Sequence, residues 1–94
     1  MLEIKIKEQI NQILSLSNSD RQLDLAIEEM SELIKALLKD RRYETQGTKL
    51  NVLEEIADVY NMLDQVKIIY GLSESDIAII RCEKNERTLE RLSK

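Results

Sequence analysis

Two groups of carboxylates are the side chains of this sequence whose types and spacing could do chemistry. The first group lies in the stretch IEEMSELI, from Ile27 to Ile34, and the second lies in LEEIADVY, from Leu53 to Tyr60. Each stretch has an apolar residue, two glutamates, an apolar residue, a spacer, a third acid and two apolar or aromatic residues. Grouped carboxylates can bind a hard divalent cation, whereas the simplest alternative is that they are solvated residues of helices that favour glutamate.

Four segments are expected to be helices, and the acidic groups lie in the second and the third. Apolar residues recur at steps of three and four, and the chain has no proline and only two glycines, which favours an all-α fold. The longest polar break, Glu44–Asn51, is expected to be a loop, with Asn51 capping the third helix. The expected helices span approximately residues 2–16, 20–43, 51–70 and 74–92. Short connections predict an antiparallel four-helix bundle with the second and third helices as its central pair.

Helical phase separates the acids within each group. One residue advances about 100° around a helix, so each side chain has a direction relative to the apolar face. Glu29 and Glu55 fall inside the apolar arcs of their helices. The remaining acids lie at the borders of these arcs (Glu32, Asp58) or on the polar side (Glu28, Glu54).

The apolar arcs themselves are expected to form the core. On the second helix the main apolar face consists of Leu23, Ile27, Met30, Ile34 and Leu37, at alternating steps of four and three. On the third helix, Tyr60 and Tyr70 are also expected to be core residues.

Carboxylates at such positions need a cationic partner, because an ionised carboxylate in an apolar setting costs several kcal/mol unless it is paired. The same arcs hold almost no basic residue, with Lys67 as the exception. The chain has no histidine, which argues against zinc and against a histidine-containing di-iron site. An all-oxygen ligand set suits Mg²⁺, with Mn²⁺ as a possible substitute, and Mg²⁺ commonly shares its ligands with substrate phosphates. The sequence therefore predicts a magnesium site and a phosphate-bearing substrate.

The composition of the chain limits the kind of protein that could carry this site. The 94 residues form one expected domain, 1–94, with a thin core that oligomerisation would complete. A net charge of −4 gives no indication of stable nucleic-acid binding, and no segment has the length and apolarity of a membrane span. The single cysteine, Cys82, fits a reducing compartment, and a cytoplasmic location is expected.

The acidic pattern resembles that of a known family. EEMSE (Glu28–Glu32) followed by EIAD (Glu55–Asp58) is similar to the E-E-x-x-E and E-x-x-D motifs of the MazG-like, all-α nucleoside triphosphate pyrophosphatases. The resemblance covers about residues 23–92. It implies the helical-bundle MazG fold, assembled as a homodimer or homotetramer. It also implies hydrolysis of a nucleoside triphosphate between its α and β phosphates, giving the monophosphate and pyrophosphate with the help of Mg²⁺.

The resemblance also implies roles for individual residues. Four acids would be metal ligands: Glu29, Glu32, Glu55 and Asp58. Glu28 would orient the attacking water, or it would contact the metal ligands without binding the metal itself. The helix after the second motif would contact the phosphates or the nucleotide through its basic and amide side chains, for which the positional matches are Lys84, Asn85 and Arg87.

Two other functions are compatible with the sequence. The first keeps the fold and the chemistry but acts on phosphoribosyl-ATP instead of a (deoxy)nucleoside triphosphate. The second is a non-enzymatic helical interaction module whose acids lie on the surface or pair with basic residues of a partner. The inward phase of Glu29 and Glu55 counts against the interaction module.

Overall fold

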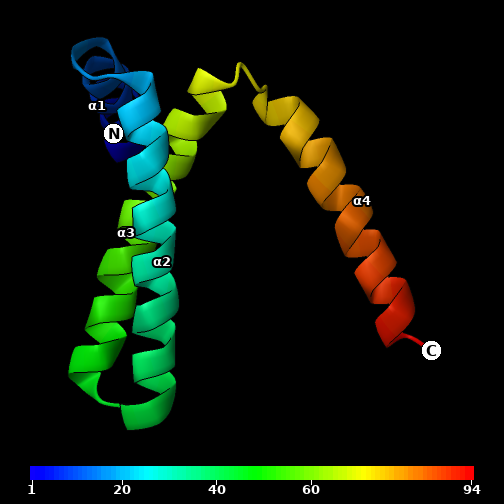
Figure 1. Cartoon of the computed structure of the whole chain (residues 1–94). Coiled ribbons are helices and arrows are strands. Elements are labelled where there is room, and N and C mark those ends of the chain that lie inside the picture. The colour runs from blue at the N-terminus through cyan, green and yellow to red at the C-terminus, as the bar shows by residue number, and fades with distance from the viewer.

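The computed structural model describes all 94 residues and consists of four α-helices without β-strands. The helices are α1 (Leu2–Leu16), α2 (Ser19–Tyr43), α3 (Gln46–Ile69) and α4 (Glu74–Leu92), as Figure 1 shows. The all-α class and the number of helices predicted from the sequence are therefore confirmed. None of the helices is long and apolar enough to cross a membrane.

Side-chain caps define where α2, α3 and α4 begin. The side chains of Asn18, Thr45 and Ser73 each accept a hydrogen bond from a backbone N–H in the first turn of the helix that follows, at 3.0–3.1 Å. At α3 the cap is reciprocal, since the Thr45 backbone N–H donates to the hydroxyl of Thr48. The prediction of a loop through Asn51 is wrong, because this capping box starts α3 at Gln46. The connection between α2 and α3 contains only Glu44 and Thr45.

α2 and α3 form an antiparallel hairpin and are the central pair, as predicted (Figure 1). The buried residues of the pair include Ala26 and Ala36 of α2 and Val59 and Met62 of α3. The small alanine side chains let the two helices approach closely. A buried hydrogen bond of 2.7 Å also links the two helices, donated by the side-chain amide of Gln22 to Oε1 of Gln65.

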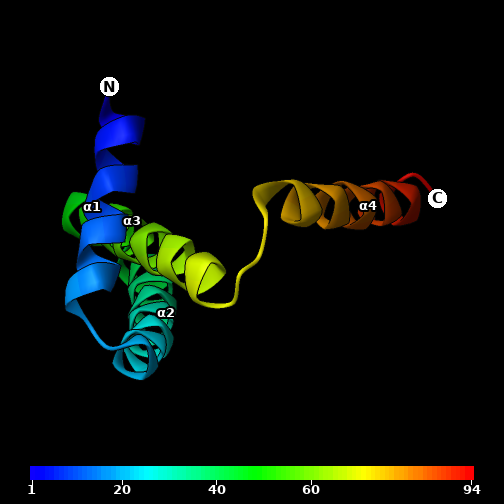
Figure 2. The same ribbon diagram turned by 90° about the horizontal axis from the view of Figure 1, so that it is seen from above.

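α1 and α4 are placed very differently. α1 packs on α3 and buries Ile10, whereas α4 extends away from the other three helices and buries no residue (Figures 1 and 2). A single chain therefore does not form the four-helix antiparallel bundle that was predicted. The physical reason is the short turn after α3, in which Gly71 adopts a left-handed conformation (φ 64°) and redirects the chain.

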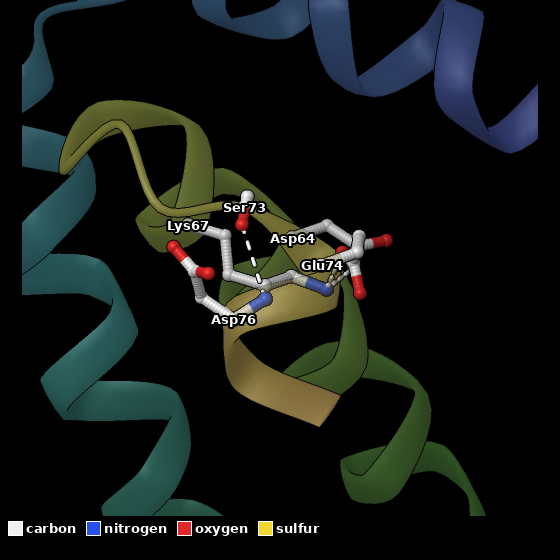
Figure 3. Close-up of polar contacts among 5 residues, drawn as sticks. All are labelled: Asp64, Lys67, Ser73, Glu74 and Asp76. Carbon is white, nitrogen blue, oxygen red and sulfur yellow. Dashed lines mark hydrogen bonds and ion pairs between the residues drawn. The ribbon is translucent and has the colours of Figure 1, made fainter. Parts of the chain in front are cut away.

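A group of polar contacts fixes this turn (Figure 3). The Lys67 ammonium of α3 forms ion pairs with Asp64, one turn earlier, and with Glu74, the first residue of α4. The backbone N–H of Leu72 also donates to the Lys67 carbonyl at 2.9 Å. These contacts raise the pKa of Lys67, with the hydrogen bond to Glu74 as the largest cause, and they lower the pKa of Glu74. They hold the start of α4 against the end of α3.

The core of the single chain is sparse. Only seven residues are buried, five of them apolar. The predicted core positions of Tyr60 and Tyr70 are wrong for the single chain, since their side chains are 68% and 63% exposed. Most of the apolar face predicted for α2 is also exposed, because α3 packs on the neighbouring side of that helix.

Candidate metal centre

Three acids meet between the two central helices. Glu29 of α2 and Glu55 and Asp58 of α3 each offer one carboxylate oxygen, and these oxygens lie within 4.8 Å of one another. Glu55 and Asp58 are three residues apart and so share one side of α3, while Glu29 reaches them from the facing helix. Glu29 and Glu55 are half-buried and Asp58 is exposed. The two glutamates therefore form the partly buried part of the site, and Asp58 lies on its solvent-exposed side.

The positions of these acids follow from the helical phase. Glu29 and Glu55 point toward the α2–α3 contact, where the sequence placed them, while Glu28 and Glu54 are exposed. Because an α-helix keeps its period regardless of its neighbours, the direction of each side chain could be obtained from sequence alone. The distance between the acids could not, since it depends on the register of the antiparallel hairpin.

The acids destabilise one another's ionised forms. Burial raises the pKa of Glu29, and the charges of Asp58, Glu55 and Glu32 raise it further. Burial likewise raises the pKa of Glu55, followed by the charges of Asp58, Glu32 and Glu54. Both shifts are those expected when carboxylates share a partly dehydrated site without a neutralising cation.

No group of the chain neutralises this cluster. None of its three acids forms an ion pair with a lysine or arginine, and Lys67, the basic residue that the sequence left available, is engaged by Asp64 and Glu74. The ion pair between Lys67 and Asp64 could have been predicted from the sequence, because residues three apart on a helix are neighbours.

A buried carboxylate oxygen without a hydrogen-bond partner tests whether a metal ion fits the cluster. Oε2 of Glu55 is fully buried and has no hydrogen-bond partner. A buried carboxylate oxygen without a partner is costly, and a cation at the cluster would satisfy it. The donors are all carboxylate oxygens, and the only cysteine is exposed on α4. The residues present therefore fit a hard divalent cation such as Mg²⁺ or Mn²⁺.

Two further acids of the predicted site lie outside the triad. The Glu32 carboxylate is exposed and lies 3.4 Å from the Lys35 ammonium, although its charge still contributes to the raised pKa values of Glu29 and Glu55. Glu28 is exposed on the polar side of α2. The ligand role of Glu32 and the water-orienting role of Glu28 stay predictions.

The predicted substrate-binding residues are not brought to the acids within one chain. Lys84, Asn85 and Arg87 are exposed on α4, which leads away from the α2–α3 hairpin (Figure 1). Lys84 and Arg87 line a shallow surface hollow together with Thr88, Glu90 and Arg91. Asn85 lies beside Cys82 in a second shallow hollow of the same helix. The phosphate-binding role of these residues stays a prediction.

Comparisons with protein-family models, with curated proteins and with solved structures found no match to this chain.

Proposed function

We propose that the protein is a Mg²⁺-dependent nucleotide pyrophosphohydrolase. Its substrate would be a (deoxy)nucleoside triphosphate, cleaved by water between the α and β phosphates to the monophosphate and pyrophosphate. The observation that carries the proposal is the carboxylate triad of Glu29, Glu55 and Asp58, which has no basic partner and includes one buried oxygen that a cation would satisfy. The proposed reaction is inferred from the similarity of the acidic motifs to those of MazG-like enzymes.

The acidic residues of the chain would have two roles in this reaction. Glu29, Glu55 and Asp58 hold the cation between α2 and α3, with Glu32 beside them at the edge of the site. A divalent cation there supplies charge neutralisation for the phosphates and activation of water. Glu28, on the solvent side of α2, orients the water, whose oxygen bonds to phosphorus as the α–β anhydride bond breaks and pyrophosphate leaves. Positioning and electrostatic stabilisation account for most of the expected rate enhancement.

The acids cannot attract a triphosphate without help from basic side chains. Lys84 and Arg87 are the proposed source, with Asn85 as a neutral donor to the nucleotide. In a single chain they are exposed on α4, which extends away from the hairpin (Figure 2). The proposal therefore includes an assembly of two or four copies, in which α4 of one chain comes near the acids of another and completes the bundle.

A panel of nucleotides tests the activity. Each nucleoside and deoxynucleoside triphosphate, together with phosphoribosyl-ATP, is incubated with protein and Mg²⁺, and pyrophosphate and orthophosphate are measured separately. We expect release of pyrophosphate that depends on Mg²⁺. Release of orthophosphate alone, or turnover that persists in a chelator, would contradict the proposal.

Glu54 provides a matched control for Glu55 in this assay. The two residues are adjacent on α3, but Glu54 is exposed whereas Glu55 is half-buried with an unpartnered oxygen. Glu55→Gln should lower kcat by at least about a hundredfold, in the range seen when a group that stabilises transition-state charge is removed. Glu54→Gln should stay within about twofold of wild type. Equal effects of the two substitutions would show that the acids act only through net charge.

A further inference from the structure

A row of basic side chains follows the acidic cluster along α2. Five of the six acids of α2 precede Lys35, whereas four of its five bases lie between Lys35 and Arg42. Three of these bases, Lys35, Lys39 and Arg42, follow one another at steps of four and three, so they share one side of the helix. We call these three residues the basic row. All three are exposed, and neither the metal site nor the α4 residues proposed to bind substrate include them.

The basic row begins at the edge of the acidic cluster. The Lys35 ammonium lies 3.4 Å from the Glu32 carboxylate. Glu32 is itself near the cluster, because its charge contributes to the raised pKa values of Glu29 and Glu55. Relative to Glu29, Glu32 falls about 60° to one side of the helix, and the basic row falls about 80–140° in the same sense. From Lys35 to Arg42 the row is about 10 Å long, and it runs toward the connection between α2 and α3 (Figure 1).

The positive charges of the basic row are not neutralised within the chain. Lys39 and Arg42 form no ion pair, and the exposed pair of Lys35 with Glu32 is of a kind that contributes little. Like charges three and four residues apart on a helix repel each other. The helix dipole favours bases in the last turn, where Arg41 and Arg42 lie, but Lys35 and Lys39 precede that turn. An anion bound along the row would remove the repulsion.

A shallow surface hollow lies along the basic row. It is lined by the three bases together with Leu38 and Tyr43, and no acid contributes to it. By contrast, the hollow on α4 that holds the other proposed phosphate-binding side chains includes Glu90. The Arg42 guanidinium lies 6.0 Å from the centroid of the Tyr43 ring, a contact that leaves its N–H groups free to donate to an anion.

We propose that the basic row binds the β- and γ-phosphates of the nucleotide and, after cleavage, the pyrophosphate product. This inference rests on the proposed function, which places the reacting phosphates at the metal between α2 and α3. The β- and γ-phosphates carry most of the negative charge of the substrate and the nucleoside carries none, so this end of the substrate suits three cations. The row belongs to the same chain as the triad, and it adds cations that need no second copy to those proposed for α4.

A short anion fits the basic row better than a long one. Glu28 and Glu32 border the row at its end near the cluster, and they would repel a polyanion such as nucleic acid that extended past Lys35. A diphosphate group that ends at a bound metal ion would not meet this repulsion, because the metal neutralises the acids.

Arg41 provides a matched control for Arg42. The two residues are adjacent in the last turn of α2, both are exposed, and neither forms an ion pair. Arg41 falls about 120° from Glu29 in the opposite sense, so it lies on the other side of the hairpin from the basic row. Replacement of either arginine by glutamine removes the same charge from the same turn, but only Arg42→Gln removes a cation from the row.

Calorimetric titration with inorganic pyrophosphate, in the presence of Mg²⁺, measures binding without turnover. Arg42→Gln and Lys39→Gln should each raise the Kd at least about tenfold, because each removes a charge-assisted hydrogen bond to phosphate. Arg41→Gln should leave the Kd within about twofold of wild type. Equal effects of the two arginine substitutions, or a wild-type protein that does not bind pyrophosphate at millimolar concentration, would overturn the proposal.

Comparison with the nucleotide assay separates this inference from the proposed function. Pyrophosphate binding that depends on the basic row, in a protein that hydrolyses no nucleotide, would refute the activity and leave the row as a pyrophosphate-binding site. Mg²⁺-dependent turnover, with pyrophosphate binding that is weakened by Lys84→Gln but not by Lys39→Gln or Arg42→Gln, would refute the row and leave the activity. If both are correct, Arg42→Gln should raise KM with little change in kcat, because it removes an interaction made equally by the substrate and the transition state.

Discussion

At the scale of single residues, the two adjacent glutamate pairs have divided roles. Glu28 and Glu54 are solvated, whereas Glu29 and Glu55 are half-buried, near each other and without a basic partner. Helices tolerate exposed glutamates at almost no cost, but burial and the charges of neighbouring acids raise the pKa of both Glu29 and Glu55. The inward acids therefore reduce the stability of the metal-free protein, and a bound cation would reverse that effect.

Glu29→Gln tests this conclusion at the residue itself. The substitution removes one of the mutually repelling charges with little change in shape, so the metal-free variant should melt at a higher temperature than wild type. Mg²⁺ should stabilise the wild-type protein by about 2.7 kcal/mol at a concentration of one hundred times its dissociation constant, and it should stabilise the variant much less. Thermal melts monitored by circular dichroism, with and without Mg²⁺, measure both effects. A wild-type melting temperature that is unaffected by millimolar Mg²⁺ would exclude the metal site.

The raised pKa values of Glu29 and Glu55 also predict a pH dependence. Below the ordinary glutamate pKa of 4.5, these residues are protonated in both the folded and the unfolded chain. As the pH rises above that value, the unfolded chain loses its protons first, so the contribution of these two residues to the folded state's stability falls. Urea titrations of metal-free wild type and of the Glu29→Gln variant should therefore differ little at low pH and diverge as the pH rises. A constant difference across this range would contradict the assigned cause.

At the scale of the elements, caps and turns decide how the helices connect. The Thr45–Thr48 capping box starts α3 after a connection of only two residues. The Thr48 hydroxyl also donates a 2.8 Å hydrogen bond to Asp40 of α2. This short connection sets the register of the hairpin, and that register brings Glu29 opposite Asp58. A local capping motif thus controls the geometry of the candidate metal centre.

Loss of this cap should be measurable. Thr45→Ala removes the oxygen that accepts the Thr48 backbone N–H, and it should reduce the free energy of unfolding by about 1 kcal/mol. Ser15→Ala is a suitable control, since Ser15 is an exposed helical serine that bonds only to the Gln12 carbonyl of its own helix. The control should stay within about 0.5 kcal/mol of wild type in urea unfolding. A smaller loss for Thr45→Ala than for Ser15→Ala would show that the capping box does not support the hairpin.

At the scale of the whole molecule, the unusual feature is how little one chain buries. The single chain exposes many large apolar side chains, and α4 lies apart from the other helices (Figure 2). The proposed assembly of two or four copies would link folding to protein concentration. The melting temperature of wild type should therefore rise with concentration between about 5 and 500 µM, because association stabilises the folded chain by mass action. Differential scanning calorimetry measures this shift, and a melting temperature independent of concentration would indicate a self-sufficient monomer.

The sequence by itself determined the helices and the direction of the inward acids, since both depend on local periodicity. The spacing of apolar residues predicted four helices, and the 100° step predicted that Glu29 and Glu55 point inward while Glu28 and Glu54 do not. The start of α3 was misplaced because Asn51 and Thr45 both suit a helix start, and only the formed capping box distinguishes them.

The tertiary structure decided which groups meet. It brought Glu29 of α2 to Glu55 and Asp58 of α3, and it placed Lys67 at the turn before α4 in an ion pair with Glu74. It also left most of the apolar face predicted for α2 exposed and held α4 apart, which no pattern within a helix could reveal. The physical reason is that periodicity gives each side chain a direction around its own helix, whereas the identity of its neighbour depends on hairpin register and turn conformation.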